Sequence, residues 1–287
     1  MPTEQSIAIA SSIALGALWL VESLVPLLQH FRSGRDRAAH AGRNIALGLM
    51  NAGVRALLFT ALIWWTTEYA RANSFGLLHV LGLPLWARFA AAILLLDAWG
   101  YIWHVLSHKV PVLWRFHAVH HHDREVDATT ALRFHAGEIL IGSAALLFVM
   151  PVLGITVAEL LVYELILIPV SIFHHANVRL PERLDRVLRL VIVTPRMHIV
   201  HHSSWEPETD SNFSGLFSFW DRLAGTFRLR DPASIRLGLE GYSTHDHSTL
   251  RGMLATPLSR SKAQYGTPPA IAGGLHRPTL AHDHQGP

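Results

Sequence analysis

The sequence predicts an all-α protein, a polytopic bundle of membrane helices with a helical cap, and its composition and hydropathy pattern are the first observations behind this prediction. Half of the 287 residues are hydrophobic and only 16% are charged, whereas about a quarter of the residues of a soluble domain are charged. The apolar residues also gather in runs that approach or exceed the roughly 20 residues a helix needs to cross a bilayer. We therefore expect about four membrane-embedded helical segments.

Three apolar runs have the length of a single membrane span, and a fourth is about twice as long. The first three cover residues 6–28, 44–65 and 85–106. The fourth, residues 139–173, contains Pro151 and Gly154, so we expect it to form a helical hairpin. The first run lacks a basic start and is too long for the core of a signal peptide, which indicates a permanent membrane helix.

The distribution of arginine predicts how these helices are oriented. The segment 30–43 carries Arg32, Arg35, Arg37 and Arg43 but only one acidic residue, Asp36. Loops rich in Lys and Arg stay on the cytoplasmic side of a membrane. With the fourth run as a hairpin, residues 104–138 and 174–202 lie on that same cytoplasmic side.

Histidine clusters are the third observation, because twelve of the twenty histidines lie between His104 and His202. One cluster has the spacing H-x-x-x-H and two have the spacing H-x-x-H-H. Residues three or four apart share a face of a helix, and imidazole is the commonest metal-binding side chain. The chain has no Cys, so the pattern predicts a nitrogen-rich site for two metals. The eight patterned ligands are His104, His108, His117, His120, His121, His198, His201 and His202.

Four further histidines adjoin these clusters. We add His175 to the predicted ligands, because two adjacent residues of a helix cannot both face one metal and His174 then faces away. His135, just before an apolar run, is a further candidate ligand, and we interpret His122 as a neighbour of the cluster. Isolated histidines such as His40 are expected to be structural. Imidazole suits iron, zinc and copper, so the ligand type leaves the metal open.

Polar residues near the clusters are candidates for hydrogen bonds to the ligands. Asp97 lies two helical turns before the first cluster, and a carboxylate inside an apolar helix is costly and often functional. We expect it either to orient a ligand imidazole through its second N–H or to pair with Arg88 or Arg55. The segment from Asp210 to Asn212 follows the last cluster and is expected to donate or accept hydrogen bonds around it.

Other function classes fit the sequence less well. The chain has no basic stripe, so we expect no nucleic-acid partner. A zinc-dependent membrane hydrolase needs about three protein ligands and one open position, fewer than the histidines present. A metal transporter or sensor would place ionisable residues in several spans. These two remain as alternatives.

At these residues the chain resembles the fatty acid hydroxylase/sterol desaturase superfamily of integral membrane proteins. The matching stretches are residues 97–108, 114–121, 127–135, 175–177, 194–202 and 210–227. The resemblance implies a membrane-bound, non-haem di-iron enzyme that uses O2 to hydroxylate or desaturate a lipid, fatty-acyl or sterol-like substrate. It also implies two iron ions, with zinc as a possible substitute, in a cytoplasmic cap. A Gly-x-Gly-x-x-Gly motif is absent, so we expect an external electron donor of the ferredoxin or cytochrome type.

We expect residues 1–240 to form a single membrane-integral domain, with its histidine core at residues 97–227. Residues 241–287 are rich in Pro, Gly and Thr, a composition that favours a disordered tail. The expected location is a bacterial inner membrane, with the histidine site facing the cytoplasm.

Overall fold

The computed structural model describes residues 2–242 and 245–259, and within these ranges every regular element is a helix. The long helices are α1 (Glu4–Leu24), α2 (Gly34–Leu58), α3 (Thr60–Ala72), α5 (Leu85–Lys109), α7 (Ala136–Leu153) and α8 (Val157–His175). The shorter α-helices are α4 (Leu77–Val80), α6 (Pro111–His121), α9 (Glu182–Leu188), α10 (Pro195–His201), α11 (Glu206–Thr209), α12 (Phe219–Leu223), α13 (His245–Ser248) and α14 (Leu250–Ala255). Four 3-10 helices complete the set: η1 (Ala128–Leu132), η2 (Pro232–Ser234), η3 (Glu240–Tyr242) and η4 (Thr256–Leu258).

The long helices form a membrane bundle, as the sequence predicts. By length and composition, α1, α5, α7 and α8 can each cross a membrane, and α2 with the helices that follow it can supply a fifth span that is bent by 48°. Large apolar side chains such as Leu57, Phe148 and Trp86 are exposed on these helices, where lipid replaces water. The protein is therefore an integral membrane protein with an all-helical fold.

The fourth apolar run is a hairpin, as predicted, formed by α7 and α8. The helix α7 ends at Gly154, which has a left-handed φ of 72° that favours glycine. Thr156 then caps α8 through a capping box with Glu159. Gly76 packs against the tip of the hairpin, where an added Cβ would lie 2.5 Å from the Gly154 Cα. The break between the two helices is therefore set by local backbone requirements.

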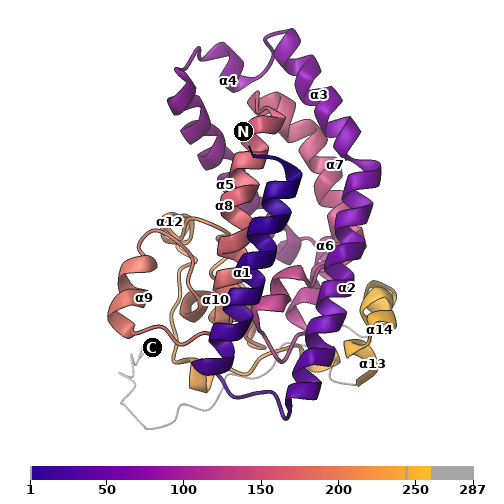
Figure 1. Cartoon of the computed structure of the whole chain (residues 1–287), viewed down its shortest axis with the longest axis vertical. Coiled ribbons are helices and arrows are strands. Elements are labelled where there is room, and N and C mark those ends of the chain that lie inside the picture. The colour runs from indigo at the N-terminus through magenta and orange to yellow at the C-terminus, as the bar shows by residue number, and fades with distance from the viewer. Residues whose placement is uncertain (1, 243–244, 260–287) are drawn as a thin grey trace, which may run out of the picture.

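The cap lies at one end of the bundle. Figure 1 shows α6, α9 and α10 at the end where α1 turns into α2, whereas α3 and α4 lie at the opposite end. The hairpin returns the chain to the cap end, so the clusters before α7 and after α8 meet there. The arginine-rich segment 30–43 begins at this same end, as expected.

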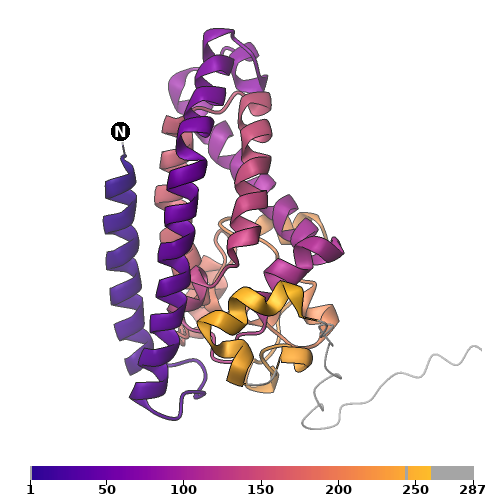
Figure 2. The ribbon, with the colours of Figure 1, turned by 90° about the vertical axis from the view of Figure 1, so that its right-hand side faces the viewer.

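The segment after residue 240 differs from our prediction of a disordered tail. Residues 245–259 contain α13, α14 and η4, which lie against the cap and the bundle (Figure 2). Met253 is fully buried with Leu47 and Val119, and Thr249 caps α14. The prediction is wrong for these residues, because their apolar contacts on α2 and α6 are non-local. The rest of the predicted tail, residues 243–244 and 260–287, lies outside the described residues.

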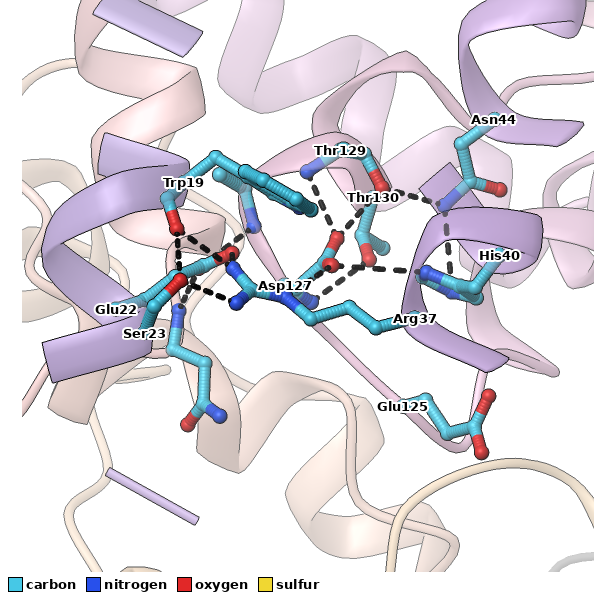
Figure 3. A network of polar contacts seen from close by, with 12 residues as sticks. Trp19, Glu22, Ser23, Arg37, His40, Asn44, Glu125, Asp127, Thr129 and Thr130 are labelled. Atoms are coloured by element: carbon cyan, nitrogen blue, oxygen red, sulfur yellow. Dashed lines mark hydrogen bonds and ion pairs between the residues drawn. The ribbon is translucent and has the colours of Figure 1, made fainter. Parts of the chain in front are cut away.

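Buried polar contacts join α1 and α2 to the loop at η1 (Figure 3). Arg37 donates to Glu22 at 2.7 Å, and the other oxygen of Glu22 accepts from the backbone N–H groups of Ala128 and Asn177. These bonds anchor the N-terminal helix to both chain segments that flank the α7–α8 hairpin.

The same region explains His40, which we expected to be structural. His40 Nε2 lies 3.0 Å from both oxygens of Asp123, the residue that directly follows the histidines of α6. The fully buried Arg133 donates from Nε to the carbonyl of Val119 at 2.9 Å. These contacts fix the C-terminal end of α6, which carries three of the predicted metal ligands.

Candidate metal centre

Helix ends bring the predicted ligands together at the junction of the cap and the bundle. The last two turns of α5 carry His104 and His108, and α6 carries its cluster at its C-terminal end. Pro195 is the first residue of α10, a short helix that carries His198 and His201. His202 is its C-cap residue. The end of α8 supplies His175. The site is therefore built from four helices that the membrane bundle orients.

The imidazoles form two groups in which the ligand atoms lie within 4.8 Å of one another and can hold a metal ion. The first group is His104, His108, His117, His121 and His201. The second group is His120, His175, His198 and His202. All eight patterned histidines and His175 belong to one of these groups, and the donor set suits iron or zinc.

Distances between ring nitrogens fit bound metals. His104 Nε2 lies 3.2 Å from His117 Nε2, and His175 Nε2 lies 3.1 Å from His120 Nε2 and 3.0 Å from His198 Nε2. Metal–nitrogen bonds of about 2.0–2.1 Å place neighbouring ligand atoms roughly 3.0–3.4 Å apart. The separations therefore match those of nitrogens that share one cation.

Hydrogen bonds to the opposite ring nitrogens decide the tautomers. His104 Nδ1 is 2.7 Å from the carbonyl oxygen of Phe213, and His117 Nδ1 is 2.8 Å from Glu138 Oε1. A carbonyl oxygen only accepts, so His104 Nδ1 carries the proton and Nε2 presents a lone pair. The carboxylate of Glu138 holds the Nδ1 proton of His117 in the same way. Two such lone pairs that face each other at 3.2 Å repel unless a cation lies between them, so the residues fit a metal.

Three more bonds of this kind hold ligand rings. His201 Nδ1 lies 2.7 Å from the Ser211 carbonyl, and His175 Nδ1 lies 2.7 Å from the Ser171 carbonyl. The third bond holds His108 of the first group, whose Nδ1 is 3.2 Å from Asp210 Oδ1. Such partners fix ring orientation and raise the basicity of the metal-binding nitrogen.

Burial keeps five of the clustered histidines in the neutral form that binds metal. It lowers the pKa of His120, His121, His198, His201 and His202 well below 6.5. The neighbouring imidazoles lower the pKa of these rings further, because several positive charges in one pocket repel one another. Metal binding at neutral pH therefore needs no deprotonation of these rings.

The structure places three neighbouring histidines outside both groups. His135 Nδ1 accepts from the backbone N–H of Gly137 at 2.8 Å and thereby caps α7, while Nε2 donates to the carbonyl of Leu254 at 3.1 Å. Both of its nitrogens are thus engaged, which differs from the ligand role we considered. The rings of His174 and His198 are tilted against each other with centroids 4.2 Å apart, and the ring of His122 contacts that of Tyr242.

We expected Asp97 to bond to a ligand imidazole or to pair with Arg88 or Arg55, and the structure gives it other partners. Its carboxylate accepts from Trp220 Nε1 at 2.8 Å, from the backbone N–H of Phe217 at 3.0 Å and from Tyr163 Oη at 3.1 Å. It touches no ligand imidazole, and Arg88 pairs with Glu159 instead. Asp97 therefore holds the loop after Asn212 against α5 and α8, a non-local role that helical spacing does not reveal.

Asn212 acts through its neighbours. Its side chain bonds to the backbone of Met197 and Arg228, and its φ of 52° is in the left-handed region. This turn aims the carbonyls on either side of it, those of Ser211 and Phe213, at two ligand rings of the first group. The predicted hydrogen bonding around the last cluster thus comes from Asp210 and from backbone, with Asn212 shaping the turn.

Glu138 is the site residue that the sequence reasoning missed. It is buried in the first turn of the apolar helix α7 and bonds to His117. A lone carboxylate at the start of an apolar helix, three residues after His135, was the available signal, because such a charge needs a buried partner.

An apolar cavity of about 190 Å³ adjoins the histidines. Its lining includes ligand rings of both groups, such as His104 and His120, and the apolar side chains of Trp103, Phe134 and Leu167. A hydrocarbon chain that enters this cavity would lie directly beside the predicted metal positions.

Comparison with known proteins assigns this arrangement to a family. The fatty acid hydroxylase family model matches residues 89–226, the stretch from α5 to α12 that carries every histidine of the two groups. A cholesterol 25-hydroxylase-like protein from Danio rerio is 32% identical over 187 residues, which are 63% of this chain and 70% of that protein. The chain belongs to the fatty acid hydroxylase family. The family assignment agrees with the resemblance inferred from the histidine motifs.

Other relatives in the fatty acid hydroxylase superfamily match shorter parts. Ornithine lipid hydroxylase OlsE from Rhizobium tropici is 30% identical over 161 residues, which are 56% of this chain and 47% of that protein. Human alkylglycerol monooxygenase is 29% identical over 134 residues, 45% of this chain and 28% of that protein. The chain thus aligns with about half or less of the length of these two relatives. No solved structure matches the chain.

Proposed function

We propose that this protein is a membrane-bound non-haem di-iron oxygenase that uses O2 to hydroxylate a lipid, fatty-acyl or sterol-like substrate. The observation that carries the proposal is the contact between two histidine groups and an apolar cavity inside a membrane protein. The relatives are named as hydroxylases or monooxygenases of lipids or sterols, which favours hydroxylation over desaturation.

The nine imidazoles would hold the two iron ions, five in the first group and four in the second. When bound, these ions supply O2 activation with electrons from outside the chain. Glu138, Asp210 and the carbonyl oxygens hold the Nδ1 protons of five rings, so that the Nε2 atoms of these rings stay directed at the metal positions. The protein thereby sets ring orientation before a metal arrives.

The cavity supplies the second requirement of the reaction, which is a positioned C–H bond. Trp103, Phe134 and Leu167 present apolar surface to the chain, and their bulk excludes water from the space beside the histidines. We propose that the substrate enters from the bilayer, because the cavity lies at the cap end of membrane helices.

The remaining parts of the proposal concern location and partners. The arginine-rich segment and the histidine groups share one end of the bundle, which supports a cytoplasmic site, and we propose a bacterial inner membrane. Electrons come from a separate donor of the ferredoxin or cytochrome type. We also propose one domain, predicted as residues 1–240 and extended by the packing of α14.

The test is anaerobic loading of the purified protein with ferrous iron, followed by reaction with 18O2 and a chemical reductant in lipid nanodiscs. We expect two irons per chain by elemental analysis and one 18O atom in each hydroxylated lipid by mass spectrometry. Less than one iron per chain, or products that carry oxygen only from water, would contradict the proposal. Zinc-loaded protein is the matched control, since zinc occupies similar ligands but has no redox chemistry.

A further inference from the structure

The cavity beside the histidines continues into the membrane bundle. A second cavity of about 340 Å³ shares six lining residues with the first, among them Trp103, Tyr163 and Leu167. Its remaining walls come from α2, α5, α7 and α8, and they are apolar except for a few groups. The two cavities therefore form one path that leads away from the metal positions along the bundle.

An ion pair between Arg55 and Glu164 lines the second cavity. Arg55 Nη2 of α2 donates to Glu164 Oε1 of α8, and the two side chains are 35% and 15% exposed. Within the described residues neither side chain makes another hydrogen bond. Arg55 thus keeps most of its five N–H donors open, and Glu164 keeps one oxygen open.

A second ion pair within the bundle, formed by Arg88 and Glu159, shows what a structural role looks like. Arg88 pairs with Glu159 at 2.7 Å and also donates to the carbonyls of Leu78 and Gly154. Glu159 accepts from the backbone N–H and the hydroxyl of Thr156 as well. These groups are satisfied by the fold, and neither lines the two cavities. The Arg55–Glu164 pair faces the path and is unsatisfied, and ionisable groups of that kind often mark substrate sites in membrane proteins.

Helical geometry sets the distance between this pair and the metal centre. Glu164 lies eleven residues before His175 on α8, which is three turns and the same face of the helix. Leu167 and Ser171, on that face between them, line the first cavity. At a rise of 1.5 Å per residue the separation is about 16 Å.

We propose that the Arg55–Glu164 pair binds the terminal hydroxyl of a long-chain substrate and so selects which carbon is oxidised. The selection of the oxidised carbon rests on the proposed function. The binding of the hydroxyl by the ion pair is independent of it. A hydroxyl accepts from the guanidinium and donates to the free carboxylate oxygen at once, so it satisfies both partners. A substrate carboxylate would gain the Arg55 donors but meet the charge of Glu164, and a plain alkane would leave both groups unsatisfied.

The distance between the ion pair and the metal centre predicts which carbon of the substrate is oxidised. An extended chain advances roughly 1.2 Å per bond, so about 16 Å corresponds to a carbon some thirteen bonds from the hydroxyl. Hydroxylation is therefore expected to centre near that carbon and to keep its distance from the hydroxyl when the chain is lengthened.

The binding test uses iron-loaded protein in nanodiscs with 1-hexadecanol, hexadecanoate and hexadecane as competitors of radiolabelled 1-hexadecanol. The double variant Arg55→Leu/Glu164→Leu removes both charges together and leaves no unpaired ion, so it is expected to fold. It should bind 1-hexadecanol about tenfold more weakly than the wild type, the loss expected for one or two hydrogen bonds, with hexadecane binding unchanged. The exposed pair on α3, changed to Glu68→Gln/Arg71→Gln, is the control and should leave both affinities as they are.

The outcomes separate this inference from the proposed function. Equal affinity of wild type and double variant for 1-hexadecanol, or an equal distribution of hydroxylated carbons in their products, would overturn the role of the pair while oxidation itself continues. Tight, pair-dependent binding of 1-hexadecanol without any oxidation would support the pair and contradict the oxygenase.

Discussion

In the first histidine group, four of the five imidazoles donate from Nδ1 to a carboxylate or a backbone carbonyl, whereas in the second group only His175 does so. The Nδ1 atoms of the other three rings, His120, His198 and His202, are buried without a hydrogen-bond partner among the described residues. Two of the partners in the first group, Glu138 and Asp210, are also acidic, and negative charge nearby favours a cation.

The difference indicates that the two halves are organised by different means. Hydrogen bonds donated by Nδ1 set four of the five rings of the first group before a metal arrives, whereas ring packing alone holds most of the second group. We therefore expect the first group to bind its metal more tightly and the second to exchange it more readily.

The largest expected effect comes from two ligands three residues apart on α10, one from each group. Both His198→Ala and His201→Ala should lower hydroxylation by more than about 100-fold, since even changes to the partners of ligands cost 10–100-fold. Their metal contents should differ, because His201→Ala leaves four imidazoles in its group and His198→Ala leaves three. Elemental analysis should show close to two irons for the former and close to one for the latter.

Equal metal loss in these two variants would contradict the comparison. His135→Ala is the control, because His135 lies outside both groups and bonds only to the backbone. That variant should keep two irons and most of the activity.

A smaller effect is expected from Glu138→Gln, which keeps the size of the side chain but removes the charge that faces His117. Metal affinity of the first group should fall about 10–100-fold, with that of the second group unchanged. A chelator competition that follows the release of both metals should show a lower affinity for the more tightly bound metal only. A lower affinity for the more weakly bound metal would mean that the groups are coupled rather than independent.

Asp97→Asn tests whether the loop that serves the first group depends on its anchor. An amide would turn an N–H2 toward some of the donors that now share the carboxylate, those of Phe217, Trp220 and Tyr163. The free energy of unfolding should fall by about 2 kcal/mol, measured by thermal melting in detergent, and metal affinity of the first group should fall less than in Glu138→Gln. An unchanged melting temperature would show that the loop is held by other contacts.

The smallest effect is on pH dependence in the metal-free protein. Burial lowers the pKa of His198 and His201 well below 6.5, so the folded state stays neutral while the unfolded chain takes up protons near pH 6.5. Stability is therefore constant above that pH and falls as the pH drops below it. A melting temperature that rises between pH 7 and pH 5.5 would contradict this, and bound metal should make the loss steeper because protons then compete with it.

Local patterns predicted much of the fold and most of the candidate site. The hairpin follows from Pro151 and Gly154, which act on their own stretch of backbone. The membership of His104 and His108 in one group follows from their spacing on one helix. On α6, spacing left two pairings open, because both the residue three positions after His117 and the one four positions after it share its face of the helix. We expected the first two histidines of the H-x-x-H-H motif to share a metal, but His117 and His121 lie in the first group and His120 in the second.

Long-range contacts decided what the sequence pattern missed. Asp97 meets backbone N–H groups more than a hundred residues away. Met253 packs on Leu47 and Val119, which gives structure to a segment that we expected to be disordered. Neither contact has a periodic signature, since each depends on which helices the bundle places side by side.

By itself the sequence determined the class of protein, the number of apolar segments and the common end of the bundle on which the histidines gather. It also gave ten candidate ligands, of which all except His135 belong to the two groups. These are consequences of hydropathy, charge and helical periodicity, which act over a few turns. Only the tertiary structure decided how the imidazoles divide between two metal positions, which partners orient them, and that a path lined by Arg55 and Glu164 reaches them. Those features arise where helices distant in sequence meet, and the packing of whole helices sets them.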